Sequence, residues 1–178
     1  MKKLLLVLLA SSIALMTTFA QAWQPDANDK LELAVAGAIL SAKEKDPLIG
    51  KWFESAYAYA VFPKVGKGGF ILGGAYGKGL VIRGNTTIGK TSLTQGSIGA
   101  QIGGQVYAEF IMFKDETALN HFRRGNFEMG AQVSAVAITL GASSDANYDG
   151  GVAIFTLPKG GLMAEASVGG QKFKYRDK

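Results

Sequence analysis

Apolar residues recur at helical spacing between residues 29 and 45. Leu31, Val35 and Ala38 fall on one side of a helix with 3.6 residues per turn. Asn28 is suited to cap the first turn, and Pro47 ends the helix because proline cannot continue one. A second, shorter helix is expected over residues 48–55.

From residue 58 the pattern changes to short apolar runs separated by glycines. Because an interior glycine costs a helix about 1 kcal/mol relative to alanine, residues 58–108 are expected to form short strands with tight turns or bulges. One helix interrupts the β region, capped by Asp115 and ending at Gly125. Other strands are predicted at residues 106–113, 127–140, 152–157, 162–168 and 172–175, with a turn over residues 143–151.

These patterns predict a single α+β domain dominated by antiparallel strands. We expect a curled sheet or a barrel-like sandwich, with an N-terminal helix and one short mid-chain helix.

The first residues have the three parts of a secretory signal peptide. Lys2 and Lys3 precede an apolar run over residues 4–15, and Ala20-Gln21-Ala22 offers small residues to a signal peptidase. The apolar run is shorter than the roughly 20 residues that a membrane-spanning helix needs. The sequence therefore predicts a signal peptide over residues 1–22, a domain over residues 23–178, and a periplasmic or secreted protein. Since the chain has no cysteine, no lipid-anchored lipoprotein is expected.

The composition of the chain limits the classes of partner that the protein is expected to bind. The net charge is +5, and losing Lys2 and Lys3 with the signal peptide lowers it by two, well below the charge density of nucleic-acid-binding proteins. The chain can form no disulfide, so the apolar core alone must hold the fold together. With 48% apolar residues and only 4 prolines, the 24 glycines indicate a compact fold with many turns rather than disorder.

One segment matches a nucleotide-binding motif by letter. Residues 84–91 fit the phosphate-loop pattern G-x-x-x-x-G-K-[ST], but glycines interrupt the region where the obligatory helix would follow. The sequence therefore favours a polar hairpin loop and no nucleotide. His121 is the only histidine, which excludes a common zinc site and favours a surface or packing role.

The acidic residues give no clear catalytic pattern. Glu109 and Glu165 lie on predicted strands, where an outward position is favoured over a buried functional acid. Asp145, Asn147 and Asp149 alternate as calcium ligands can, but the run lacks the glycine and terminal glutamate of an EF-hand loop. A solvated turn is expected, and we predict no catalytic residue, metal or cofactor.

Glycines and apolar residues form a recurring framework along the chain. It comprises Phe62-Pro63, Gly69-Phe70, Gly73-Gly74 and the segments 76–79, 96–105 and 159–162. In order and spacing, this framework resembles the SYLF-domain family over residues 30–171. The resemblance implies a phospholipid- or phosphoinositide-binding module without enzymatic activity, which in bacteria is usually exported and single-domain. The chain has no tryptophan in residues 84–96, where relatives often carry one. Actin binding, known for yeast members, is not expected of an exported bacterial-type protein.

Basic residues near the glycine-rich turns are candidates for contact with anionic head groups. The candidate lipid-binding residues are Lys64, Lys67, Lys78, Arg83, Lys90, Arg123 and Arg124, with Phe70 and Tyr76 at head-group depth. The alternative is that these charges only keep the protein soluble. The first helix is a second candidate for the membrane surface, although packing on the sheet is favoured.

The sequence therefore predicts a non-catalytic phospholipid-binding module of the cell envelope. Two alternatives stay open: a structural or protein-interaction scaffold, which includes a homo-oligomer, and a carrier of a small apolar ligand.

Overall fold

The computed structural model describes residues 22–69, 72–98, 105–125, 135–159 and 168–178. The described residues form an open seven-stranded sheet with helices on both faces, so the predicted α+β class is confirmed. The strand order is β5-β6-β4-β1-β2-β3-β7, and all neighbours are antiparallel except β5 and β6. The strands are β1 (Ala58–Gly69), β2 (Leu72–Arg83), β3 (Thr86–Ile98), β4 (Gln105–Phe113), β5 (Val136–Ala137), β6 (Val152–Pro158) and β7 (Gln171–Asp177).

The N-terminal helices form where the sequence predicts them. Helix α1 (Lys30–Lys45) is followed by the 3-10 turn η1 (Pro47–Ile49) and by α2 (Gly50–Ser55). The cap of α1 is Asp29 rather than Asn28, because the Asp29 carboxylate accepts hydrogen bonds from the backbone N–H groups of Leu31 and Glu32. Among the described residues, no helix has the length and apolar character needed to cross a membrane.

Strands β1, β2 and β3 are longer than expected, at 12, 12 and 13 residues. The prediction of short, glycine-interrupted strands is therefore wrong. Gly79 explains part of the pattern: a Cβ there would lie 2.5 Å from the carbonyl oxygen of Val61 and 2.8 Å from the Phe62 ring. Glycine lets β1 and β2 stay paired beside the register shift between Val61 and Lys64.

The phosphate-loop-like segment is a hairpin, as expected. Gly84, with φ of 58°, and Asn85 form the turn between β2 and β3, and the rest of the segment lies in β3. The expected turn around Asp145 is also confirmed, since it ends the short 3-10 helix η2 (Ala142–Asp145).

The predicted long strand over residues 127–140 is confirmed only at Val136 and Ala137. Residues 126–134 lie outside the described residues, and the chain turns after Ile138 through Gly141, whose φ is 81°. The predicted strand over residues 162–168 also lies outside the described residues, except for Val168.

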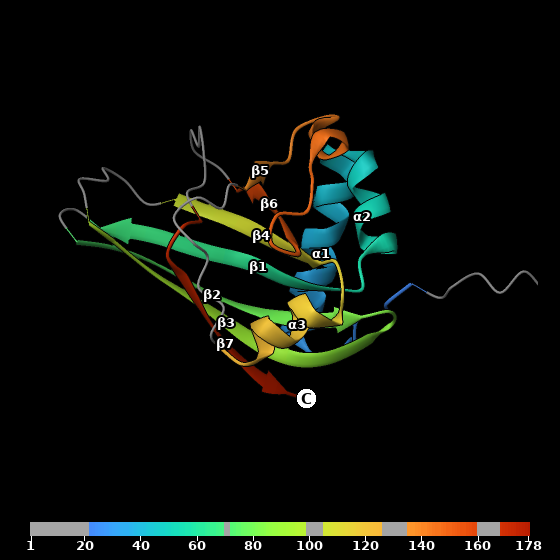
Figure 1. Cartoon of the computed structure of the whole chain (residues 1–178), viewed down its shortest axis with the longest axis horizontal. Helices are drawn as coiled ribbons and strands as arrows, with labels where there is room; N and C mark the ends of the chain where they lie inside the picture. Colours follow the sequence, from blue (N-terminus) through green and yellow to red (C-terminus); the bar gives the residue numbers. More distant parts are fainter. Residues whose placement is uncertain (1–21, 70–71, 99–104, 126–134, 160–167) are drawn as a thin grey trace, which may run out of the picture.

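The two faces of the sheet bury different cores. On one face, α1 packs Val35, Ala38 and Ala42 over strands β1, β2, β4 and β6. On the other face, α3 (Glu116–Arg123) covers a core rich in phenylalanine, which includes Phe62 and Phe122. Figure 1 shows α1 and α2 to one side of the strands and α3 crossing in front of them.

The sheet curls toward the α3 side. Gln171 on the edge strand β7 donates a hydrogen bond of 2.9 Å to Glu109 on β4, although three strands lie between β4 and β7 in the sheet. This contact requires strong curvature, so the curled-sheet prediction is confirmed, and the α3 side is the inside of the curl. The sheet stays open because β5 and β7 are its two edges.

Candidate functional site

Beyond α1, the outer face of the sheet exposes basic side chains in register. Side chains alternate between the two faces of a strand, so residues paired across strands share one face. The pairing places Lys64, Lys78, Ser92 and Lys174 in one row across β1, β2, β3 and β7. Lys90 and Arg176 are paired in an adjacent row. We call this surface the open face; it comprises Lys64, Tyr76, Lys78, Lys90, Ser92, Thr94, Lys174 and Arg176.

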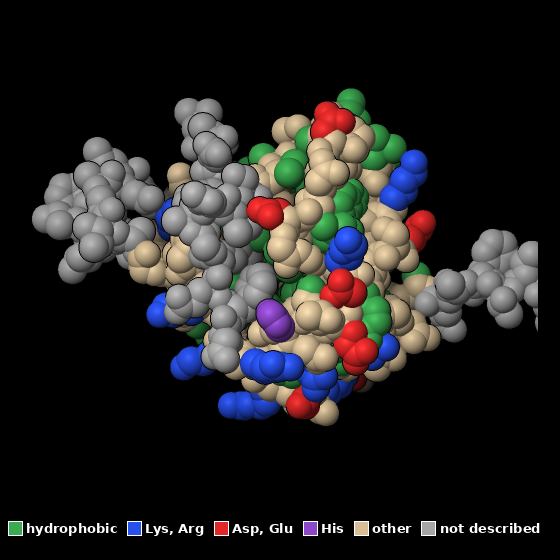
Figure 2. All heavy atoms as spheres, in the orientation of Figure 1, with side chains coloured by type: hydrophobic (Ala, Val, Ile, Leu, Met, Phe, Trp, Pro, Cys, Tyr) green, Lys and Arg blue, Asp and Glu red, His purple; other side chains and the backbone are tan. Residues whose placement is uncertain are grey.

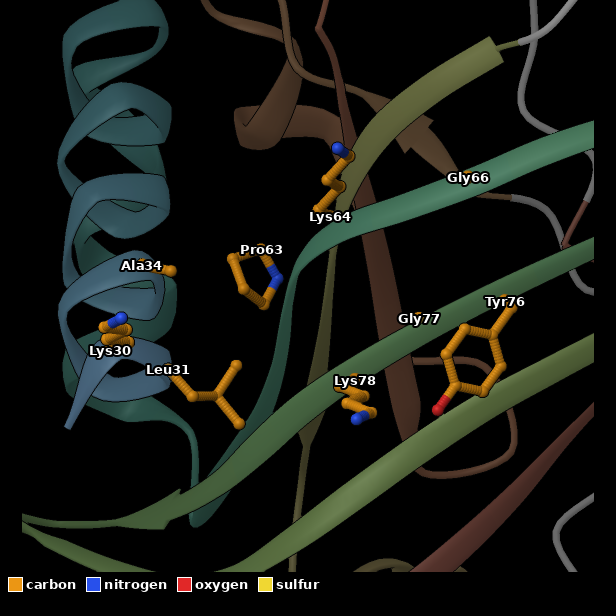
Figure 3. A pocket seen from close by; sticks show the side chains of 9 residues that line it. All are labelled: Lys30, Leu31, Ala34, Pro63, Lys64, Gly66, Tyr76, Gly77 and Lys78. Atoms are coloured by element: carbon orange, nitrogen blue, oxygen red, sulfur yellow. The ribbon is translucent and has the colours of Figure 1, made fainter.

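The open face is hollowed where it meets the first half of α1. The first hollow, of about 620 Å³, lies between Lys30, Leu31 and Ala34 of the helix and the strands β1 and β2. The second hollow, of about 380 Å³, extends across β3 to β7 and includes Lys90, Lys174 and Arg176. Leu31, Tyr76 and Lys78 line both hollows. In Figure 3, Lys78 and Tyr76 project from β2, and Lys78 lies between the Leu31 side chain of α1 and the Tyr76 ring in this view.

The described lining of the two hollows is strongly basic. Its charged members are six cations and no carboxylate: Lys30, Lys64, Lys78, Lys90, Lys174 and Arg176. Lys90 lies 3.7 Å from the Asp29 carboxylate, just outside the lining. In the part of the chain that the structure describes, none of the other five cations has an ion-pair partner within 4.0 Å. This surface therefore has an excess of positive charge next to the apolar side chain of Leu31.

Glu32 fixes the helix that forms one wall of the hollows. Its buried carboxylate accepts hydrogen bonds from the Asp26 backbone N–H at 2.7 Å, the Thr87 hydroxyl at 3.1 Å and the Lys178 ammonium at 2.9 Å. Burial acts to raise the pKa of Glu32, but these hydrogen bonds outweigh it and keep the pKa below its usual value. These contacts connect α1 to β3 and to the C-terminal residue. They therefore fix the position of α1, which forms one wall of the hollows.

The structure brings together four of the nine residues that the sequence singled out. Lys64, Tyr76, Lys78 and Lys90 all lie on the open face. Tyr76 is 52% exposed although it stands in the middle of β2, which leaves about half of its surface free for contact.

The other predicted residues lie elsewhere. Lys67 is on the inner face and only 7% exposed, because it lies three residues after Lys64 in β1 and strand side chains alternate between the two faces. Arg83 lies over the Tyr57 ring at 4.3 Å, while Arg123 forms an ion pair of 2.7 Å with Asp177. Arg124 is exposed at the end of α3. Phe70 lies outside the described residues.

Sequence reasoning missed the contribution of β7. Lys172, Lys174 and Arg176 alternate with Phe173 and Tyr175, a pattern that indicates one basic and one apolar face. That alternation was visible in the sequence, but the pairing of β7 with β3 was not, because more than seventy residues separate them. Lys30 was missed because its role depends on where α1 lies against the sheet.

Glu109 contradicts the expected outward position. It is completely buried inside the curl, where Gln171 donates to its Oε2 atom and Oε1 has no hydrogen-bond partner. Burial raises the pKa of Glu109 to about 8, and the hydrogen bond from Gln171 offsets only part of this effect. At neutral pH the carboxyl group is therefore mainly protonated, and it lies on the side of the sheet opposite to the open face.

The comparisons with known proteins agree on one family. The family model described as "Ysc84: Las17-binding protein actin regulator" matches residues 94–178, which include the last five residues of β3 and all of β4, α3, β5, β6 and β7. "Beta cell expansion factor A" of Aeromonas veronii is 30% identical to the chain over 139 residues. That alignment covers 76% of this chain and 52% of the relative, so the chain spans about half the length of the curated relative it matches.

Proposed function

Because this chain belongs to the Ysc84, or SYLF, family, we propose that it is a non-catalytic module of the cell envelope that binds anionic phospholipid. The open face is the surface that meets the lipid. The signal peptide that the sequence predicts supports a periplasmic or secreted location, where lipid surfaces would be available to the protein.

One observation carries the proposal: among the described residues, six cations and no carboxylate line two adjoining hollows on one face of the sheet. Each Lys or Arg near an anionic membrane surface contributes about 1 kcal/mol of attraction. Leu31 and the half-exposed Tyr76 stand among these cations, where their apolar surface can reach the boundary between head groups and acyl chains. Charge and apolar contact therefore favour the same surface.

The simplest alternative is that the lysines only solubilise the protein or protect an edge strand. Lysine on an edge strand discourages pairing with another chain, which fits Lys174 on β7. That role does not explain Lys64 and Lys78, because β1 and β2 lie in the interior of the sheet. A lipid surface accounts for the whole set.

The test is cosedimentation with vesicles of phosphatidylcholine, with and without phosphatidylglycerol. We expect the mature protein to bind only the anionic vesicles, and to dissociate as salt shortens the Debye length from about 10 Å at 0.1 M to about 3 Å at 1 M. The variant Lys64→Glu, Lys78→Glu, Lys174→Glu should bind about 100-fold more weakly, from the loss of roughly 1 kcal/mol per lysine.

A control variant of equal net charge distinguishes an effect of the open face from an effect of the total charge. Lys51, Lys114 and Arg124 are exposed and line neither hollow. The variant Lys51→Glu, Lys114→Glu, Arg124→Glu has the same net charge as the first variant and should keep most of the binding. Equal losses in the two variants would refute the assignment to the open face, and no binding by the unmodified protein would refute lipid binding itself.

A further inference from the structure

We propose that the open face binds a lipid head group carrying two phosphates held about 12 Å apart, as across a disaccharide, with one phosphate in each hollow. This inference rests on the proposed function and specifies the class of lipid. The two hollows have separate sets of cations and share only Lys78: Lys30 and Lys64 line the first, and Lys90, Lys174 and Arg176 line the second.

The arrangement of the cations points to bound anions rather than to general solubility. Lys64 lies directly opposite Lys78 in the register of β1 and β2, and Lys90 lies directly opposite Arg176 in the register of β3 and β7. Like charges directly across two strands destabilise a sheet. Two such pairs on one face are unfavourable in the free protein, although Asp29, at 3.7 Å from Lys90, offsets part of the repulsion in the second pair. A phosphate between the members of each pair would replace the repulsion by two charge-assisted contacts.

The distance between the two cation pairs determines how far apart the two phosphates of the head group must be. The first pair lies between β1 and β2 and the second between β3 and β7, so their centres are two strands apart in the sheet order. Neighbouring strands are about 4.8 Å apart, and the second pair is displaced by two residues, or about 6.6 Å, along β3 and β7. The two anion positions are therefore roughly 12 Å apart. A pyrophosphate or two adjacent phosphates would be too short to occupy both positions.

The residues between the two positions suit the spacer of such a head group. Tyr76 and Leu31 line both hollows, and Ser92 lies between Lys78 and Lys174 in the cross-strand row. An aromatic ring, an apolar side chain and a hydroxyl group can contact a sugar through its C–H faces and its hydroxyls. The same face of a second copy of this chain is a poor occupant, because its cations would meet those of the first copy.

The experiment compares two forms of one lipid. Vesicles of phosphatidylcholine contain either a disaccharide lipid with two phosphates or its form with a single phosphate at twice the mole fraction, so that total phosphate is equal. The mature protein should bind the two-phosphate vesicles about fivefold more tightly, which corresponds to roughly 1 kcal/mol from simultaneous contact. Equal binding to the two kinds of vesicle would overturn the inference.

Removing one pair should remove the preference. The variant Lys90→Ala, Arg176→Ala should bind the two kinds of vesicle equally and should still bind them better than vesicles of phosphatidylcholine alone. The control Lys51→Ala, Lys114→Ala should retain the preference. A preference that survives in Lys90→Ala, Arg176→Ala would overturn the two-position site while leaving lipid binding intact, whereas failure of the unmodified protein to bind any anionic vesicle would overturn both proposals.

Discussion

At the scale of the residue, Glu109 shows how far burial can change the chemistry of one side chain. The sequence placed Glu109 on a strand correctly but could not show which face would be buried, because both faces of β4 are covered. An alternating pattern identifies the inner face only where the other face is solvated. The near-continuous apolar run around Glu109 was the available signal for a strand buried on both sides.

The raised pKa of Glu109 predicts an unusual dependence of stability on pH. Between its ordinary pKa near 4.5 and the folded value of about 8, the unfolded chain releases a proton that the folded protein keeps. The free energy of unfolding should therefore fall as pH rises through this window, by up to about 1.4 kcal/mol per pH unit.

The variant Glu109→Gln tests this, because an amide resembles the protonated acid and does not ionise. Urea unfolding at several pH values between 5 and 8 should show a flatter profile for Glu109→Gln and higher stability than the unmodified protein at pH 8. Parallel profiles for the two proteins would show that Glu109 does not titrate in this range.

The glycines divide into two kinds, which the sequence alone could not separate. A Cβ at Gly79 would collide with the Val61 carbonyl and the Phe62 ring, whereas a Cβ at Gly66, which lines the first hollow, would meet nothing within 4 Å. Gly79→Ala should therefore destabilise the protein by about 2 kcal/mol or more. Gly66→Ala should change stability by less than about 0.5 kcal/mol. Thermal unfolding of the two variants side by side would check this, and equal effects would contradict the packing described for β2.

At the scale of the element, helical spacing and capping residues were sufficient to locate α1 and α3, and the short helix expected over residues 48–55 corresponds to α2. The strands were harder to predict, because a glycine within an apolar run suggests the end of a strand when only its neighbours in the sequence are considered. The close packing that glycine allows between β1 and β2 appears only once the two strands are paired. The open face depends on the further pairing of β3 with β7, so only its β1, β2 and β3 residues could be anticipated.

The pairing of Lys64 with Lys78 across β1 and β2 leads to a prediction about the stability of the sheet. Lys64→Thr removes the repulsion from Lys78 and introduces a residue that favours strands, so it should raise the free energy of unfolding by roughly 0.5 kcal/mol at low salt. The repulsive part of the gain should diminish at about 1 M salt, where charges on the surface are screened. Chemical denaturation at both salt concentrations measures it, and a loss of stability on substitution would contradict the repulsion.

At the scale of the whole molecule, the curled sheet separates a buried core on its inner face from an exposed basic surface on its outer face. The inside of the curl buries the phenylalanine-rich core under α3, and the outside carries α1 and, beside it, the open face. Figure 2, which has the orientation of Figure 1, shows Lys and Arg side chains along the margin of the molecule where β7 and the C-terminus lie. A surface of this kind can meet a membrane without any change in the fold.

The orientation of the protein on a membrane tests the central claim most directly. The chain has no cysteine, so an environment-sensitive dye can be attached at a single new one. Thr94 on the open face and Thr139 near η2 are both exposed, and Thr139 adjoins Leu140, which is 82% exposed and would mark a competing apolar contact. On addition of anionic vesicles, the dye at Thr94→Cys should shift its emission to the blue, and the dye at Thr139→Cys should not. A shift at residue 139 alone, or at neither residue while the protein is bound, would contradict the claim that the open face meets the lipid.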